Sequence, residues 1–142
     1  MEFKIINKDN WHECITMWTK DDKFIASNLY SIAEAQFYPK AISKAIYEDS
    51  VMVGYIMYGE DENDESIIAI DRLMIGEKHR RNGYATAAIK KVIKYAGENG
   101  YKLIKSSTAL ENEPMRSTFE SNGFNTTGEM DGNEIIYYYS MR

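Results

Sequence analysis

Six consecutive residues near the middle of the chain could form an anion-binding loop, Arg80-Arg81-Asn82-Gly83-Tyr84-Ala85. An apolar stretch typical of a strand, Ile67 to Ile75, precedes this loop, and an amphipathic helical pattern from Ala85 to Ala96 follows it. Backbone N–H groups at a helix start have no partner inside the helix, and the helix dipole adds positive potential there. Gly83 lacks a Cβ, so the backbone can approach a phosphate closely at this point. The order of strand, loop and helix therefore predicts a site for a nucleotide-like cofactor that carries phosphates.

The loop does not match two other common phosphate-binding motifs. No Gly-Lys-Ser/Thr follows Gly83, as a P-loop would require, and only one glycine of the G-x-G-x-x-G dinucleotide fingerprint is present. Six such residues alone are a weak signal, because arginine and glycine are common. Their place between a predicted strand and a predicted helix is what favours a binding loop.

The elements that must position this loop predict an α/β domain built around a mixed sheet. Four helices are expected, the first carrying Trp11, Ile15 and Trp18, with Asn7, Asp9 or Asn10 as its cap. The other three span about 28–37, 85–96 and 113–122. The hydrophobic patterns predict seven strands, at 3–6, 45–47, 51–58, 67–75 and 101–107 and in a final hairpin whose second arm is 135–139.

The bulk composition fits a single domain over residues 1–142 and excludes several classes of function. Hydrophobic residues make up 44% of the chain, which is enough for a core without metal or disulfides. The sequence contains no cluster of cysteines and histidines that would indicate a metal site. Cys14 is the only cysteine, which favours a buried structural thiol and a cytoplasmic location. The net charge of −5 argues against nucleic-acid binding. Neither a signal peptide nor a membrane-spanning run is expected.

Two motifs in the correct order resemble the GNAT family of N-acetyltransferases, and the resemblance covers nearly the whole chain. The loop at residues 80–85 fits the family's Q/R-x-x-G-x-G/A acetyl-CoA motif. The stretch Asn112 to Phe124 resembles its N-x-x-A-x-x-x-Y-x-x-x-G-F helix. Segments 24–35, 45–59 and 71–75 look most similar to the bacterial spermine/spermidine (diamine) acetyltransferases.

The resemblance implies a GNAT fold in which splayed central strands hold acetyl-CoA. Main-chain groups at the end of the 67–75 strand would bind the pantetheine arm, and the amides from Arg81 to Thr86 would cradle the pyrophosphate. Asn112 would contact the cofactor arm, although capping of the following helix explains its presence almost equally well. The predicted cofactor-binding residues are Leu73, Met74, Ile75, Arg80, Arg81, Asn82, Gly83, Tyr84, Ala85, Thr86 and Asn112.

The expected reaction is direct attack of a neutral amine on the thioester, so the enzyme must help to remove a proton. A free amine has a pKa near ~10.4 and is almost fully protonated at neutral pH. Asp71, just before the pantetheine-binding segment, is the first candidate for a water-mediated base or for amine recognition. Glu34 is a second candidate for substrate binding. A salt bridge for Asp71 and a solvated helix face for Glu34 are the structural alternatives.

The leaving thiolate marks a departure from the family pattern. The family often places a tyrosine eight residues into the second motif as a general acid, and Phe119 stands there in this chain. The thiolate could leave unaided, another hydroxyl such as Tyr137, Tyr138 or Ser117 could substitute, or the domain could bind acetyl-CoA with little catalysis. We expect that Phe119→Tyr does not lower activity.

Taken together, these features predict an acetyl-CoA-dependent N-acetyltransferase of a small polycationic amine such as spermidine or spermine. Another amine is the alternative within the same class: a peptide N-terminus, a lysine, an amino acid or an aminoglycoside. A weakly catalytic acyl-CoA-binding module is the alternative from a different class. Neither a nucleic-acid nor a membrane partner is expected, and a homodimer follows from the family resemblance alone.

Overall fold

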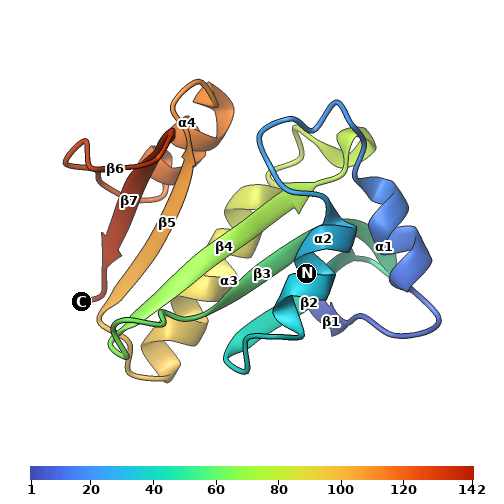
Figure 1. Cartoon of the computed structure of the whole chain (residues 1–142), viewed down its shortest axis with the longest axis horizontal. Helices are drawn as coiled ribbons and strands as arrows, with labels where there is room; N and C mark the ends of the chain where they lie inside the picture. Colours follow the sequence, from blue (N-terminus) through green and yellow to red (C-terminus); the bar gives the residue numbers. More distant parts are fainter.

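A single seven-stranded mixed sheet organises the chain, in the order β1-β2-β3-β4-β5-β7-β6 (Figure 1). The structure is a computed structural model that describes residues 1–142. The strands are β1 (Glu2–Ile5), β2 (Ala41–Glu48), β3 (Val51–Glu60), β4 (Ile67–Ile75), β5 (Leu103–Ala109), β6 (Met130–Asp131) and β7 (Glu134–Ser140). The helices are α1 (Trp11–Met17), α2 (Asn28–Ala35), α3 (Tyr84–Glu98) and α4 (Glu113–Ser121), with a short 3-10 turn at Glu77–His79. The predicted α/β class, with seven strands and four helices, is confirmed.

The start of β2 and the cap of α1 differ from the expectation from sequence. β2 begins at Ala41, four residues before the predicted strand, because its pairing with β3 extends to Gly59. The start of α1 has no side-chain cap. Instead, the Asn7 backbone N–H donates to Asn10 Oδ1 at 2.8 Å, and Asn10 N–H donates to Asn7 Oδ1 at 3.2 Å. The two asparagines therefore close a turn ahead of the helix.

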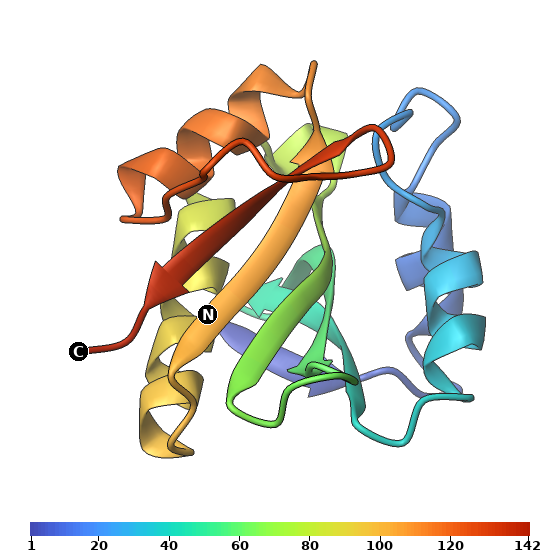
Figure 2. The same ribbon diagram turned by 60° about the vertical axis from the view of Figure 1, so that its left-hand side comes forward.

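The helices cover the two faces of the sheet in pairs, α3 and α4 on one side and α1 and α2 on the other (Figure 2). The apolar stripe of α3, with Ala88, Ile89, Val92 and Ala96, is fully buried in the larger core cluster. A smaller core lies under α1 and α2 and includes Cys14. Burial raises the pKa of the Cys14 thiol to about 12, which fits a structural thiol.

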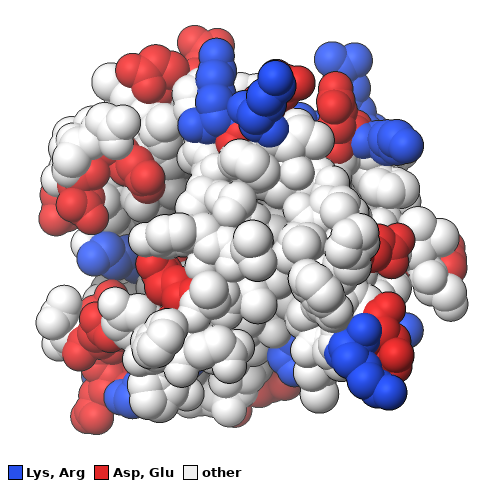
Figure 3. Space-filling view, turned by 45° about the vertical axis from the view of Figure 1, so that its right-hand side comes forward, with Lys and Arg blue, Asp and Glu red and all other residues white.

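The side of the molecule that carries α1 and α2 shows a broad area without charged side chains (Figure 3). Four large apolar side chains on α2 and just after it are exposed: Leu29, Tyr30, Phe37 and Tyr38. None of the helices combines the length and the apolar character needed to cross a lipid bilayer.

The central strands β4 and β5 separate halfway along their length, as Figure 1 also shows. Their parallel pairing runs only from Ile67 opposite Leu103 to Ile70 opposite Ser106. Beyond Ile70, β4 pairs only with β3, while β5 continues along β7 as far as Ala109. The predicted splay is confirmed, and it leaves one edge of β4 free from Asp71 onward.

A β-bulge lies where the two strands part. Met57 of β3 pairs with Arg72, and its neighbour Tyr58 pairs with Ile70, so Asp71 is an extra residue in β4. A bulge bends the strand and redirects the side chain of the inserted residue. The irregularity thus presents Asp71 at the mouth of the opening between β4 and β5.

Candidate active site

Three connected cavities run across the splayed strands. The first, the cofactor groove, has a volume of about 650 Å³ and lies between the 80–86 loop, the end of β4 and the start of α4. The second, the central chamber, has a volume of about 450 Å³ and lies between β4 and β5. The third, the acceptor groove, has a volume of about 510 Å³ and lies below β4 toward α2. Leu73, Asn112 and Met115 line both of the first two cavities, and Asp71 and Arg72 line both of the last two.

The cofactor groove contains a cluster of free amide donors. No backbone N–H from Arg81 to Thr86 donates to a backbone or side-chain acceptor, and the first N–H of α3 that does so is Ala87, to Gly83 O at 3.0 Å. Arg81 and Gly83 both have positive φ, at 65° and 76°. Alternating backbone conformations of this kind turn successive N–H groups toward a common anion. The chain therefore offers six amide donors and a helix N-terminus where a pyrophosphate would bind.

Two of the predicted cofactor side chains shape this loop from within. Arg80 Nε donates to Ile75 O at 2.9 Å, and its guanidinium also pairs with Asp22. Asn82 Nδ2 donates to His79 O at 3.0 Å. Both residues border the groove or its loop, but their hydrogen bonds fix the loop conformation. The amides, rather than the Arg80 side chain, are thus the free donors for phosphate.

The free edge of β4 suits an extended amide-bearing arm. Leu73, Met74 and Ile75 pair with β3 on one side only, and all three line the cofactor groove. An arm that contains amides can add to such an edge as a further strand would. The residues present therefore fit acetyl-CoA, with its phosphates at the start of α3 and its thioester at the central chamber.

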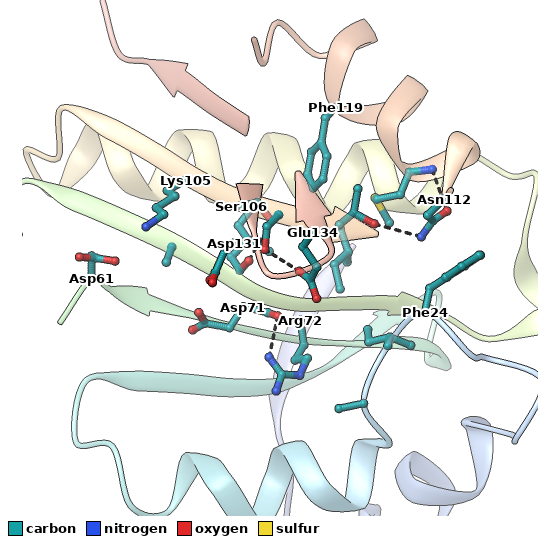
Figure 4. A pocket seen from close by; sticks show the side chains of 18 residues that line it. Phe24, Asp61, Asp71, Arg72, Lys105, Ser106, Asn112, Phe119, Asp131 and Glu134 are labelled. Carbon is teal, nitrogen blue, oxygen red and sulfur yellow. Dashed lines mark hydrogen bonds between the residues drawn. The ribbon is translucent and has the colours of Figure 1, made fainter. Parts of the chain in front are cut away.

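Asp71 faces the central chamber from the β4 side, as Figure 4 shows. Its carboxylate is open to solvent in the cleft, yet the walls remove much of the surrounding water. This desolvation raises the pKa of Asp71 to about 6, while Arg72 opposes the shift and Glu34, Asp61 and Glu62 add to it. Asp71 thus combines a position at the reaction chamber with a pKa suited to a general base near neutral pH.

Glu34, the other predicted acceptor residue, lies on the wall of the acceptor groove but is already paired. Arg72 Nη2 lies 3.4 Å from Glu34 Oε1, and Arg72 Nη1 donates to Asp71 O at 2.9 Å. Arg72 Nε is buried and has no hydrogen-bond partner. The ion pair joins α2 to the bulge of β4 and brings Glu34 and Asp71 into one cleft.

The opposite wall of the chamber carries acidic residues that sequence reasoning missed. Asp131 and Glu134 extend from the β6–β7 hairpin toward the side of the cleft that holds Asp71 (Figure 4). Ser107 Oγ donates to Glu134 Oε1 at 2.6 Å, which anchors that carboxylate to β5. Lys105 is the basic residue of this wall. The sequence alone could not predict this wall, because it depends on the β5–β7 register, which places Glu134 opposite Ala109.

Asn112 caps α4, and its position also allows the cofactor contact that the sequence left open. Its Oδ1 accepts from Met115 N–H at 3.3 Å, so it caps α4, and the residue also lines the cofactor groove and the chamber. Phe119 lines the chamber as well, is 2% exposed, and packs against Phe124 and Tyr137.

Tyr137, named above as a fallback general acid, is not brought to the reaction chamber. Its hydroxyl donates to Glu120 Oε2 at 2.6 Å and accepts from Arg116 Nε at 3.1 Å, both on α4. Tyr137 lines none of the three cavities. Burial raises its pKa, with opposing effects from Arg116 and Glu120. Its hydroxyl fastens α4 to β7, and we assign it no role in proton transfer.

This arrangement defines a class of protein: an acyl-CoA-dependent transferase in which cofactor and acceptor meet between two splayed strands. A family model described as the acetyltransferase (GNAT) family matches residues 4–124, and the chain belongs to this family. Acetyl-CoA is accordingly the co-substrate. Comparison with curated proteins gives no match.

Solved acetyltransferase structures share the fold at low sequence identity. A Bacillus subtilis acetyltransferase in complex with CoA is 10% identical with a TM-score of 0.72, covering 99% of this chain and 97% of that one. A chimeric spermidine N-acetyltransferase from Vibrio cholerae is 12% identical with a TM-score of 0.77, covering 99% and 96%. A ribosomal-protein alanine N-acetyltransferase from Escherichia coli is 11% identical with a TM-score of 0.72, covering 99% and 93%.

Proposed function

We propose that this acetyltransferase transfers the acetyl group of acetyl-CoA to a primary amine of a small polycation such as spermidine or spermine. The observation that carries the proposal is the charge of the cavities outside the cofactor groove. Seven acidic residues line them: Glu34, Glu60, Asp61, Glu62, Asp71, Asp131 and Glu134. Three basic residues do so: Lys40, Arg72 and Lys105. Two of these are already paired, Lys40 with Glu60 and Arg72 with Glu34.

The geometry supports a division of labour along a linear amine. Asp71 receives the reacting nitrogen's proton through water, because it lies where the chamber meets the acceptor groove and has a raised pKa. Asp131 and Glu134 on the other wall, and Glu60 to Glu62 at the outer end, attract the remaining ammonium groups. The amine nitrogen attacks the acetyl carbon, the C–S bond breaks, and CoA leaves as the thiol after protonation.

The first test measures initial rates of CoA release across spermine, spermidine, diamines, monoamines, amino acids, short peptides and aminoglycosides. The proposal predicts kcat/KM values for spermidine or spermine well above those for a monoamine of similar size. Asp131→Asn with Glu134→Gln should raise KM for the triamine with less effect on the monoamine. Glu129→Gln is the matched control, because this carboxylate leads into the same hairpin but lines none of the cavities.

One observation favours a second acceptor class. Arg72 lines the acceptor groove beside Asp71, so its guanidinium could also bind a carboxylate. An amino acid or a peptide would place its amine near Asp71 and its carboxylate near Arg72. Faster turnover of such acceptors than of polyamines would select this alternative. Turnover of no amine, with intact acetyl-CoA binding, would instead indicate a binding module.

We also propose that residues 1–142 work as one cytoplasmic catalytic domain that forms a homodimer. The free buried Cys14 supports a reducing compartment. The exposed apolar side chains at α2 offer a face that pairing would cover. Light scattering of the purified protein tests the dimer directly, and a monomer at all concentrations would contradict it.

A further inference from the structure

The position of the thioester follows from where the cavities join. The cofactor enters along the groove at the start of α3, and the acceptor enters from the side of Asp71, so the reacting carbon and sulfur lie where the two spaces meet. Leu73, Asn112 and Met115 line both of these spaces. Thr108 of β5 lines the chamber, and its Oγ1 accepts from Asn112 Nδ2 at 3.1 Å. The Thr108 hydroxyl is therefore adjacent to this junction.

A chain of hydrogen bonds makes Thr108 Oγ1 an acceptor and leaves its own O–H without a partner. Met115 N–H can only donate, so the Asn112 atom that faces it must be the acceptor Oδ1. The amide nitrogen of Asn112 then faces Thr108 and donates to Oγ1. Thr108 consequently acts as the acceptor in this pair, and its own O–H makes no hydrogen bond to the protein although the residue is 6% exposed. A nearly buried donor without an acceptor lies beside the place where a sulfur anion forms.

We infer that Thr108 is a catalytic residue that donates a hydrogen bond from its hydroxyl to the leaving CoA sulfur. Phe119 stands where the family often has a tyrosine for this purpose. This inference rests on the acetyltransferase function but not on the identity of the acceptor. A phenyl ring offers no donor, and Phe119 lines the same chamber. The two serines that line the chamber already donate to protein acceptors, Ser106 to Ile70 O and Ser107 to Glu134, so Thr108 is the hydroxyl of the chamber whose O–H is free.

The role is stabilisation of an anion rather than net proton transfer. A thiol has a pKa near ~8.5, far below that of an alcohol, so the thiolate does not deprotonate Thr108. As the amine nitrogen bonds to the acetyl carbon, the C–S electron pair moves to sulfur, and the Thr108 O–H donates to that sulfur. The ammonium proton leaves through water to Asp71, and the thiolate takes a proton from solvent on release. The loss of a hydrogen bond to the charged sulfur should lower the rate roughly 10- to 100-fold.

The test uses CoA alone, so that it does not depend on any acceptor. The affinities of CoA and of desulfo-CoA are measured by calorimetry across about pH 6 to 9, around the ~8.5 of a free thiol. In the unmodified enzyme, CoA should gain affinity over desulfo-CoA as the pH rises, with a midpoint below that of free CoA. Thr108→Val removes the hydroxyl at nearly constant volume and should move this midpoint upward by at least ~1 pH unit. Thr108→Ser should keep it.

Three results would overturn the inference. The first is a Thr108→Val titration identical to that of the unmodified enzyme. The second is an equal loss of CoA and desulfo-CoA affinity in Thr108→Val, which would show that the residue only supports Asn112 and the groove. The third is a Thr108→Ser variant that behaves like Thr108→Val. If the sulfur effect is found but no amine is acetylated, the thiolate contact stands and the proposed acceptor class fails.

Discussion

At the scale of single residues, the proposed proton transfer rests on one carboxylate, Asp71, in a cleft of mixed charge. Asp71 owes its position to being the inserted residue of the β4 bulge, and it owes its pKa of about 6 chiefly to desolvation. Its neighbour Arg72 opposes that shift, but Glu34 shares the guanidinium. Arg72 therefore helps to position Asp71 through its backbone, but it does not bring the pKa of the Asp71 carboxyl down to the ordinary value.

The acid limb of the pH profile should report Asp71. Only the carboxylate can accept a proton, so kcat/KM should rise with pH through about 6 and level off above it. Arg72→Gln removes the cation that favours the carboxylate, so the limb should move to higher pH. Lys105→Gln removes a charge from the same chamber without acting on Asp71 and should leave the limb in place. A limb that stays near 6 in Asp71→Asn would assign it to another group.

At the scale of structural elements, the loop that opens α3 should show how backbone geometry binds the cofactor. Gly83 has φ 76° and open space where a Cβ would lie, so Gly83→Ala costs stability only through its left-handed conformation, about 1 kcal/mol. The new methyl group would also disturb the amide cluster, so CoA affinity should fall at least ~10-fold. Calorimetry with CoA measures this loss.

Gly100 provides the matched control for that substitution. It has φ 75°, equally open surroundings and a position after the far end of α3, outside all three cavities. Gly100→Ala should therefore lose similar stability but keep CoA affinity. An equal loss of affinity in both variants would mean that general destabilisation, rather than the loop, is responsible.

The hydroxyl of Tyr137 should matter for the attachment of α4 and not for proton transfer. Tyr137→Phe removes hydrogen bonds to Glu120 and Arg116, which should lower the free energy of unfolding by about 1 kcal/mol while kcat is retained. Tyr138→Phe is the control, because no side-chain hydrogen bond involves its hydroxyl. Denaturant unfolding and steady-state rates measure the two effects, and a large fall in kcat for Tyr137→Phe would restore it as a candidate acid.

The elements differ in how far the sequence alone could predict the site. The 80–86 loop could be predicted because its donors are consecutive residues between a strand and a helix. Asp71 could be proposed from its place just before the predicted pantetheine-binding segment of that strand, but its bulge depends on pairing with β3. Thr108, Asp131 and Glu134 reach the chamber through the β5–β7 register and the splay of β4 from β5, which are tertiary features without a local pattern. The hydrogen bonds of Tyr137 to α4 could not be foreseen for the same reason.

At the scale of the whole molecule, charge is divided between the two entrances of the cleft. The cofactor side presents free amides, a helix N-terminus and the exposed Arg81, whereas five of the seven charged residues that line the acceptor groove are carboxylates. This division suits an anionic cofactor at one end of the opening and, under the proposed polyamine function, a cationic acceptor at the other end. The overall charge of −5 conceals this division.

The dependence of kcat/KM on ionic strength should show whether the carboxylates of the acceptor side attract a polyamine. Salt screens interactions between exposed charges, with a Debye length near ~10 Å at 0.1 M and ~3 Å at 1 M. For a polyamine attracted by several carboxylates, kcat/KM should fall steeply as salt rises, because attraction grows with the number of charges on the acceptor. A monoamine, which carries one charge, should lose much less. Initial rates with spermidine and with a monoamine, each at saturating acetyl-CoA, measure this difference in salt dependence. Equal salt dependence for both acceptors would show that the carboxylates of the acceptor side do not recognise the remote ammonium groups.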